Sequence, residues 1–230
     1  MPQSQQLFQT VKIRCPHCHQ EGTMQVLPAL NTAQAPELKE KVISKEVFEY
    51  TCPGCLQKNH LNYTFLYHEP EKQLMIQFIA GDHKAWINAV NEFRKLPASI
   101  SAPLRSQKYR VRAVRSQNAL VEKIQIYNCD LDDRVIELLK LLLAADFVKN
   151  KSGRKPDNAY FYAAPDGTRS ILFFSGDENI GAASVPEDLY LQVAEKYGAV
   201  LKDNHYGELI LVDSYWAKEA MKENKKLSEG

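Results

Sequence analysis

Short alternations of apolar and polar residues dominate the first eighty positions of the chain. An alternation with a period of two is typical of β-strands that have one buried face. It predicts strands over residues 11–14, 24–30, 47–50, 61–68 and 74–80. After the second of these strands, Pro36 and Glu37 begin a segment whose apolar residues have helical spacing, which predicts a short helix over 36–43.

Helical periodicity replaces this alternation in the middle of the chain. Apolar residues three or four positions apart predict helices over 83–93 and 116–126, with a strand over 109–114 between them. The segment 96–103 has a proline near each end and is predicted to be a loop. A further helix, which we expect Asp130 to cap, is apolar on almost every side and should lie at the buried centre of the protein.

The C-terminal third begins with the polar segment 150–158, which we expect to separate two domains, residues 1–150 and residues 151–230. The tripeptide Pro-Asp-Gly at 165–167 stands between two apolar stretches and predicts a β-hairpin. The later part of the chain is predicted to form a helix over 186–197 that Gly198 ends, a strand over 209–212 and a helix over 214–224.

Four of the five cysteines form two copies of Cys-Pro-x-Cys, at 15–18 and 52–55. Each pair can present two thiolates to one metal ion, and two pairs complete a tetrahedral structural zinc site. The separation of 33 residues exceeds the spacing of a compact zinc ribbon, and the helix over 36–43 accounts for the difference. We therefore expect an N-terminal zinc-ribbon-like β unit with a helical insert, in which zinc is bound by Cys15, Cys18, Cys52 and Cys55. The lone Cys129 is expected to be a small buried side chain.

A redox function is the alternative interpretation of the first cysteine pair. Cys-Pro-His-Cys is also the active-site sequence of oxidising thioredoxin-fold proteins, in which a helix N-terminus lowers the pKa of the first thiol. Here the pair is followed by a turn-like segment that ends at Gly22, and a redox enzyme needs only one such pair. Thiol–disulfide exchange is therefore the less favoured function. His17 and His19 are expected to be exposed loop residues rather than additional ligands.

The balance of charge excludes a generally basic nucleic-acid-coating protein, because 29 lysines and arginines face 28 acidic residues. Locally, five cations and no acid occur within residues 105–115. If this segment is a strand, Lys108, Arg110 and Arg112 share one face. We expect that face either to be solvated or to pair with the acidic helix start at 130–133. Contact between these three residues and a partner, including the phosphates of a nucleic acid, is the alternative.

A second charged cluster lies on the two helices predicted around residues 116–145. Its members are Glu122, Lys123, Asp132, Asp133, Arg134, Glu137 and Lys140. Paired carboxylates such as those of Asp133 and Glu137 could hold a cation or act as acid and base. The preferred interpretation is that the acids lie near a helix N-terminus and that side chains three or four positions apart interact, with Glu137 attracting Lys140 and repelling Asp133.

Motifs of the common enzyme classes are absent from the sequence. The chain has no Gly-rich dinucleotide motif, Walker loop, His-Glu-x-x-His or Gly-x-Ser-x-Gly, and no catalytic residues are predicted. No apolar run is long enough to cross a membrane, and no secretory signal is visible. A cytoplasmic location without membrane contact is therefore expected.

Several of these segments, taken in order, resemble the CpXC domain proteins of bacteria. They are the two Cys-Pro-x-Cys units, Leu-Tyr-His at 66–68, and the runs 118–124 and 131–140. The resemblance covers residues 11–145. It implies a metal site at the four cysteines and implies no activity, and it leaves the role of residues 151–230 open.

Together, the patterns and the resemblance predict an α+β protein. It should have a zinc-ribbon-like β unit, a helical middle and a C-terminal α+β portion. The expected function is that of a zinc-binding, non-enzymatic binding or adaptor module, with a protein favoured over a nucleic acid as its partner.

Overall fold

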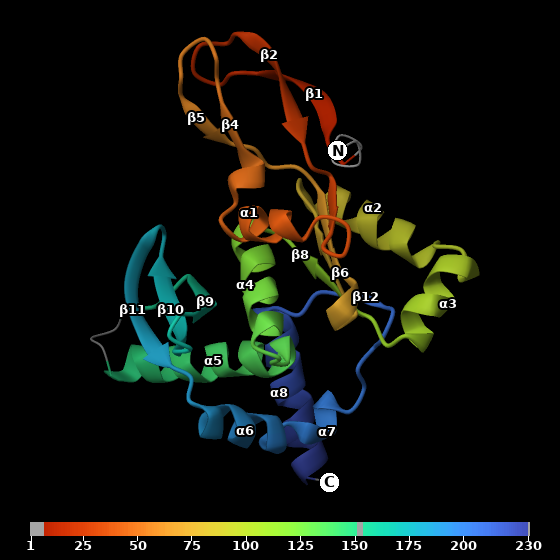
Figure 1. Ribbon diagram of the computed structural model, residues 1–230. Coiled ribbons are helices and arrows are strands. Elements are labelled where there is room, and N and C mark those ends of the chain that lie inside the picture. Colours follow the sequence, from red (N-terminus) through yellow and green to blue (C-terminus); the bar gives the residue numbers. More distant parts are fainter. Residues whose placement is uncertain (1–6, 151–153, 230) are drawn as a thin grey trace. The chain divides into compact units, whose positions relative to one another are not determined.

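The computed structural model describes residues 7–150 and 154–229 (Figure 1). It mixes helices with strands in several small sheets, which confirms the α+β class. The chain divides into two compact units: unit 1 contains residues 1–120 and 206–209, and unit 2 contains residues 121–205 and 210–230. The domain boundary expected after residue 150 adjoins residues 151–153, which lie outside the described residues, so this boundary stays a prediction.

Unit 1 begins with two antiparallel hairpins, each closed by one Cys-Pro-x-Cys turn. They are formed by β1 (Gln9–Arg14) with β2 (Glu21–Val26), and by β4 (Glu49–Thr51) with β5 (Lys58–His60). Between the hairpins lie β3 (Ala29–Asn31), a 3₁₀ turn (Pro36–Leu38) and α1 (Lys39–Ile43). The helical insert is therefore confirmed. The strand expected over 24–30 is divided into β2 and β3, with Pro28 between them.

A five-stranded mixed sheet forms the rest of the core of unit 1, in the order β12–β8–β7–β6–β3. Its further strands are β6 (Phe65–Glu69), β7 (Leu74–Phe78), β8 (Arg110–Val114) and β12 (Leu209–Ile210). β6 and β7 are antiparallel, whereas β3 pairs with β6 and β7 with β8 in parallel. β6 and β7 show the alternation expected from the sequence, and their buried residues include Phe65, Tyr67, Leu74, Ile76 and Phe78.

Two helices, α2 (His83–Arg94) and α3 (Ala98–Ser106), follow β7 in unit 1. The helix predicted over 83–93 is confirmed as α2. The prediction of a loop over 96–103 is wrong, because α3 begins at Ala98. Pro97 lies at the N-cap of α3, and its carbonyl accepts the N–H groups of Ile100 and Ser101 at 2.9 and 3.0 Å. Proline next to a helix start is favourable, because its fixed φ suits that position and a free N–H would be unsatisfied there. Pro97, the first of the two prolines, therefore marks the start of a helix, and Pro103 lies inside it.

Unit 2 is built around α5 (Asp133–Asn150). Its other elements are α4 (Gln117–Asn128, which begins in unit 1), β9 (Asn158–Ala163), β10 (Arg169–Ser175), β11 (Glu178–Ser184), α6 (Glu187–Lys196), α7 (Gly198–Leu201) and α8 (Ser214–Glu229). The three strands form an antiparallel sheet in the order β11–β10–β9, so the predicted hairpin is confirmed and β11 extends it.

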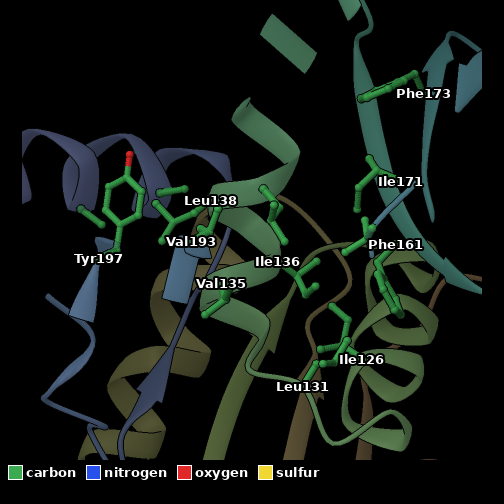
Figure 2. Packing of buried hydrophobic residues seen from close by; sticks show 14 of the residues in the cluster. Ile126, Leu131, Val135, Ile136, Leu138, Phe161, Ile171, Phe173, Val193 and Tyr197 are labelled. Atoms are coloured by element: carbon green, nitrogen blue, oxygen red, sulfur yellow. The ribbon is translucent and has the colours of Figure 1, made fainter. Parts of the chain in front are cut away.

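Side chains on opposite sides of α5 pack against different elements (Figure 2). Ile136 points toward the sheet, where Phe161 and Ile171 are buried, whereas Leu138 points toward Val193 of α6. This two-sided packing explains why α5 is apolar on almost every side, as the sequence indicated. The expected burial of α5 is confirmed for its first half, where residues 133–139 are all buried.

Two expectations about the helix ends in unit 2 are wrong. The carboxylate of Asp132, and not that of Asp130, caps α5 by accepting the Arg134 N–H at 2.9 Å. Asp130 lies in the preceding turn with φ of 55°. The helix predicted over 186–197 is confirmed as α6, but its C-cap is Tyr197, and Gly198 is the first residue of α7. The predicted cap of α4 is confirmed, since the Ser116 hydroxyl accepts the Ala119 N–H at 3.1 Å.

Candidate metal centre

The two Cys-Pro-x-Cys turns have the same backbone structure. In the first turn, Cys15 N–H donates to the Gln20 carbonyl and His19 N–H to the Cys15 carbonyl, both at 3.0 Å. The second turn repeats this pattern: Cys52 N–H donates to the Gln57 carbonyl at 3.0 Å, and Leu56 N–H donates to the Cys52 carbonyl at 2.8 Å. The residue after each turn, His19 or Leu56, has φ of 59°. The repeated sequence therefore folds as a repeated structure.

The four cysteine sulfurs meet between the two turns. All four lie within 4.8 Å of one another, and this group could hold a metal ion. Cys15 Sγ is 3.7 Å from Cys55 Sγ, and Cys18 Sγ is 3.6 Å from Cys52 Sγ. A tetrahedral zinc–thiolate site with bonds of about 2.3 Å requires sulfur separations of about 3.8 Å. A disulfide would require about 2.05 Å. The observed spacing thus fits a metal site and not a disulfide pair.

Burial divides the four cysteines into two kinds. Cys15 and Cys52, the first cysteine of each turn, are both 1% exposed. They pack with an apolar cluster formed by Met24, Val26 and Tyr50, with Val11, Ile13, Leu61 and Tyr63 at its edge. The second cysteines are more open, since Cys55 is half-buried and Cys18 is exposed. One side of the candidate site is therefore shielded from water, and the other side faces solvent.

Backbone N–H groups stabilise the thiolates of the buried cysteines. The N–H of Cys55 lowers the pKa of Cys52 to about 6, although burial opposes this effect. The N–H of Cys18 likewise lowers the pKa of Cys15 against the effect of burial. For Cys55, the N–H of Gln57 lowers the pKa, but burial and the three neighbouring sulfurs together raise it to about 12. The cluster therefore favours some thiolates but needs a cation before all four sulfurs can ionise.

Two glycines allow the turns to approach each other closely. A Cβ atom at Gly54 would lie 1.7 Å from Oε1 of Gln20, which belongs to the other turn. A Cβ atom at Gly22 would lie 2.9 Å from the hydroxyl oxygen of Tyr50. Both distances are too short for a side chain without movement of the neighbour. Small residues at these positions thus help to bring the two cysteine pairs together.

The two histidines of the first turn are not members of the sulfur cluster. His17 and His19 are exposed, as the sequence indicated, and the His19 carbonyl accepts a hydrogen bond from Arg14 Nε at 3.1 Å. In residues 7–150 and 154–229, the only group of three or more histidines, cysteines or acids that could hold a metal ion is the four-cysteine cluster.

The exposed basic face expected at Lys108, Arg110 and Arg112 is not formed. The strand β8 begins only at Arg110, and Lys108 precedes it in a turn with φ of 58°. Arg112 is 1% exposed. Val111 and Ala113 are buried as well, and because successive side chains of a strand point to opposite faces, both faces of β8 are covered. The solvated strand face was therefore a wrong expectation.

Five of the seven residues of the charged cluster on α4 and α5 are buried, and Asp132 and Lys140 are half-buried. The expected pair of Glu137 with Lys140, three positions apart, is confirmed. Lys123 Nζ lies 3.0 Å from Asp133 Oδ2 and 3.3 Å from Glu137 Oε1. Lys140 Nζ lies 2.9 Å both from Glu122 Oε1 and from Glu137 Oε1. The two ammonium groups thus lie between the carboxylates, where a bound cation had been the alternative.

Neutral donors complete this buried network. The Tyr127 hydroxyl donates to Asp133 at 2.7 Å, and the Phe161 N–H of β9 donates to Glu122 at 2.6 Å. Burial raises the pKa of Glu122, whereas Lys140 lowers it. Burial lowers the pKa of Lys123, but Asp133 and Glu137 overcome this effect and hold it above its usual value. The network links α4, α5 and β9, and the sequence pattern did not indicate that it is buried.

Among the helices that the structure describes, none has the length and apolar character that crossing a membrane requires. Comparison with curated proteins and with solved structures gave no match. A protein-family model described as CpXC protein matches residues 13–140, which is more than half of the chain and includes both cysteine pairs. The chain therefore belongs to the CpXC family.

Proposed function

We propose that this protein binds one zinc ion through Cys15, Cys18, Cys52 and Cys55, and that the zinc has a structural role. The observation that carries this proposal is the spacing of the four sulfurs, at 3.6 and 3.7 Å for the pairs that cross between the turns. Four thiolates are a typical ligand set for structural zinc, and they leave no open position for a substrate. When bound, zinc would supply the positive charge that lets all four sulfurs ionise.

Thiol–disulfide exchange is the less favoured function. Each cysteine turn is followed by a strand, β2 or β5, rather than by a helix whose N-terminus would activate the first thiol. Both turns also have the same structure, which suits one shared metal better than one redox pair.

The role supported best is that of a non-enzymatic binding or adaptor module with a protein partner. The paired carboxylates on α4 and α5 are engaged by Lys123 and Lys140, so they are poorly placed to act as acid and base. In this role the zinc would hold the two hairpins of unit 1 in a fixed arrangement.

Metal content and free thiols, measured on protein purified without added zinc, test the proposal. We expect one zinc per chain and protection of four of the five thiols until a chelator is added. Cys52→Ser should lose the zinc, whereas the control Cys129→Ser, a half-buried cysteine of unit 2, should retain it. A metal-free protein whose thiols cycle to disulfides under mild oxidant would overturn the proposal and favour the redox function.

A further inference from the structure

The four cysteines of the candidate metal centre differ in their access to solvent. Cys18 is exposed, whereas Cys15 and Cys52 are each 1% exposed and belong to an apolar cluster. Every residue from 16 to 20 is exposed as well, so the first turn leaves Cys18 open to solvent. Figure 1 shows both cysteine turns at the ends of their hairpins, away from the five-stranded sheet of unit 1. A small reactive solute therefore reaches Cys18 before it reaches the two buried cysteines.

The closest sulfur contacts described above join an open cysteine of one turn to a buried cysteine of the other. Cys18 Sγ lies 3.6 Å from Cys52 Sγ, and Cys55 Sγ lies 3.7 Å from Cys15 Sγ. Cys18 is exposed and Cys55 is half-buried, so the first pair is the more open one. Closing this pair to the roughly 2.05 Å of a disulfide needs a movement of about 1.5 Å. A bond between Cys18 and Cys52 would also join the two hairpins.

This arrangement matches what thiol oxidation requires. Metal binding and attack on an electrophile use the same deprotonated sulfur, so an accessible thiolate ligand remains a nucleophile. Hydroperoxides oxidise such a sulfur to a sulfenic acid, and a second thiol close by converts the sulfenic acid to a disulfide before irreversible oxidation. Cys18 has the exposure that the first step needs, and Cys52 has the position that the second step needs.

We propose that Cys18 is a modification site for hydroperoxides, and that its oxidation forms a disulfide with Cys52 and releases the zinc. This inference rests on the proposed zinc site and adds a redox-dependent loss of the metal. It differs from thiol–disulfide exchange, because the oxidant is a hydroperoxide and the protein itself is what changes.

The two steps balance in atoms and electrons. The Cys18 thiolate attacks one oxygen of hydrogen peroxide, so that an S–O bond forms, the O–O bond breaks and hydroxide leaves. The Cys52 thiolate then attacks Cys18 Sγ, so that the S–S bond forms, the S–O bond breaks and a second hydroxide leaves. Two thiolates thereby lose two electrons to one peroxide molecule, and protons from solvent convert both hydroxides to water.

Loss of the metal follows from the number of ligands that remain. Only Cys15 and Cys55 keep their thiolates, whereas a closed structural zinc site needs four ligands. The disulfide keeps the two hairpins joined after the zinc has left. A dithiol reductant should reverse the change, since disulfides exchange with thiolates.

Titration of the full-length, zinc-loaded protein with hydrogen peroxide tests the inference. The dye 4-(2-pyridylazo)resorcinol measures released zinc, and we expect about one zinc per chain for about one peroxide consumed. Dimedone, which traps sulfenic acids, should label Cys18 when it is present from the start. Dithiothreitol followed by zinc should restore the metal content.

Tryptic peptides distinguish the possible disulfides. The peptide 15–39 contains both cysteines of the first turn, and the peptide 46–58 contains both cysteines of the second. A disulfide between the turns joins these two peptides, whereas a disulfide within one turn leaves them separate. Fragmentation of the joined peptides should assign the bond to Cys18 and Cys52, with the other two cysteines alkylated by N-ethylmaleimide.

Two matched variants separate oxidation of Cys18 from general loss of the metal. Imidazole also binds zinc, so Cys18→His and Cys55→His should both stay zinc-loaded, which zinc content and circular dichroism verify. Cys18→His lacks the oxidisable sulfur and should release zinc about tenfold more slowly than the wild type. Cys55→His keeps both Cys18 and Cys52, and its rate should stay within about twofold of the wild type. If either variant loses its zinc, the peptide map of the wild type decides.

The other outcomes overturn the inference. They are zinc retention by the peroxide-treated wild type, equal sensitivity of the two histidine variants, and a disulfide within one turn. A protein that holds no zinc before peroxide is added contradicts the proposed zinc site itself. A zinc-loaded protein that resists peroxide contradicts only the oxidation of Cys18.

Discussion

At the scale of single residues, the cysteine turns place side chains in a backbone conformation that favours glycine. His19 and Leu56 both have φ of 59°. The left-handed conformation costs a residue with a Cβ atom roughly 1–2 kcal/mol. Leu56 is also 76% exposed, so packing within the chain does not recover this cost. The turn geometry around the sulfurs, held by the hydrogen bonds of Cys52, imposes this strain.

Replacement of Leu56 by glycine should therefore stabilise the protein. We expect Leu56→Gly to raise the free energy of unfolding of unit 1 by up to about 1 kcal/mol. Glycine adopts the left-handed conformation without strain, and this gain exceeds the extra backbone entropy that glycine loses on folding. Leu191, which is 55% exposed within α6, is the control, and Leu191→Gly should instead lower stability by about 1 kcal/mol. Urea unfolding measures both values. A destabilised Leu56→Gly protein would contradict this account of the turn.

At the scale of elements, the contact between α4 and α5 depends on buried charges that compensate one another. The side chain of Lys123 is 2% exposed, and those of Asp133 and Glu137 are 0% and 4% exposed. Such a pair or triad adds little net stability compared with apolar residues, but removal of one member leaves an uncompensated buried charge. We therefore expect the network to fix which residues of α4 and α5 face each other rather than to add much net stability.

Removal of the Lys123 ammonium should strongly destabilise unit 2. Lys123→Met removes the ammonium group beside buried Asp133 and leaves Glu137 with Lys140 alone, and we expect a loss of about 3–5 kcal/mol in the free energy of unfolding at neutral pH. Lys222→Met, which breaks the exposed pair with Glu219, should leave it almost unchanged. Chemical denaturation of unit 2, followed through Trp216 fluorescence, provides the comparison. Equal stability of the two variants would show that the buried network is dispensable.

The same variant should show a defined pH dependence. The pKa of Lys123 in the folded protein is raised above 10.5, so its charge stabilises the fold fully below that pH. This contribution is lost as the pH rises through the folded-state pKa. The stability difference between the wild type and Lys123→Met should therefore be constant from neutral pH to about 10.5 and shrink above it. Unfolding curves recorded across this range measure the difference. If Lys123 were uncharged in the folded protein, the difference would not shrink at high pH.

At the scale of the whole molecule, the apolar cluster that packs around the cysteine turns is much smaller than the cluster around α5. The cluster around Cys15 and Cys52 contains five buried residues, whereas the cluster around α5 contains fifteen. A small core depends more on additional links such as a metal. The hairpins that carry the cysteines are therefore the part of the chain whose order should depend on zinc.

Chelation of the metal should accordingly affect the two units unequally. We expect a chelator to reduce hydrogen-exchange protection of β1, β2, β4 and β5, because the four thiols lose their common ligand. Protection of α5 and β10, which belong to the larger cluster, should be retained. Mass spectrometry of exchanged peptides measures both regions in one sample. Uniform loss of protection, or none, would contradict a structural role confined to the cysteine hairpins.

The spacing of residues close together in the sequence determined much of the secondary structure of this protein. The two Cys-Pro-x-Cys units, the helical insert after Pro36 and the hairpin around residues 165–167 follow from short-range signals, since turns, caps and alternation depend on neighbouring residues. The identity of the four candidate ligands and the central position of α5 were also readable, because ligand type and an all-round apolar helix are properties of one segment.

Only the tertiary structure decided which polar residues are buried and which sulfurs meet. Arg112 and Lys123 are charged residues whose types are usually exposed, yet both are 1% exposed in the folded chain, and Lys123 is paired with Asp133 and Glu137 of the neighbouring helix. The approach of Cys18 to Cys52, 34 positions apart, depends likewise on the packing of two hairpins and on the small size of Gly22 and Gly54. Periodicity describes one element at a time, whereas burial and coordination depend on what the other elements bring to the same place.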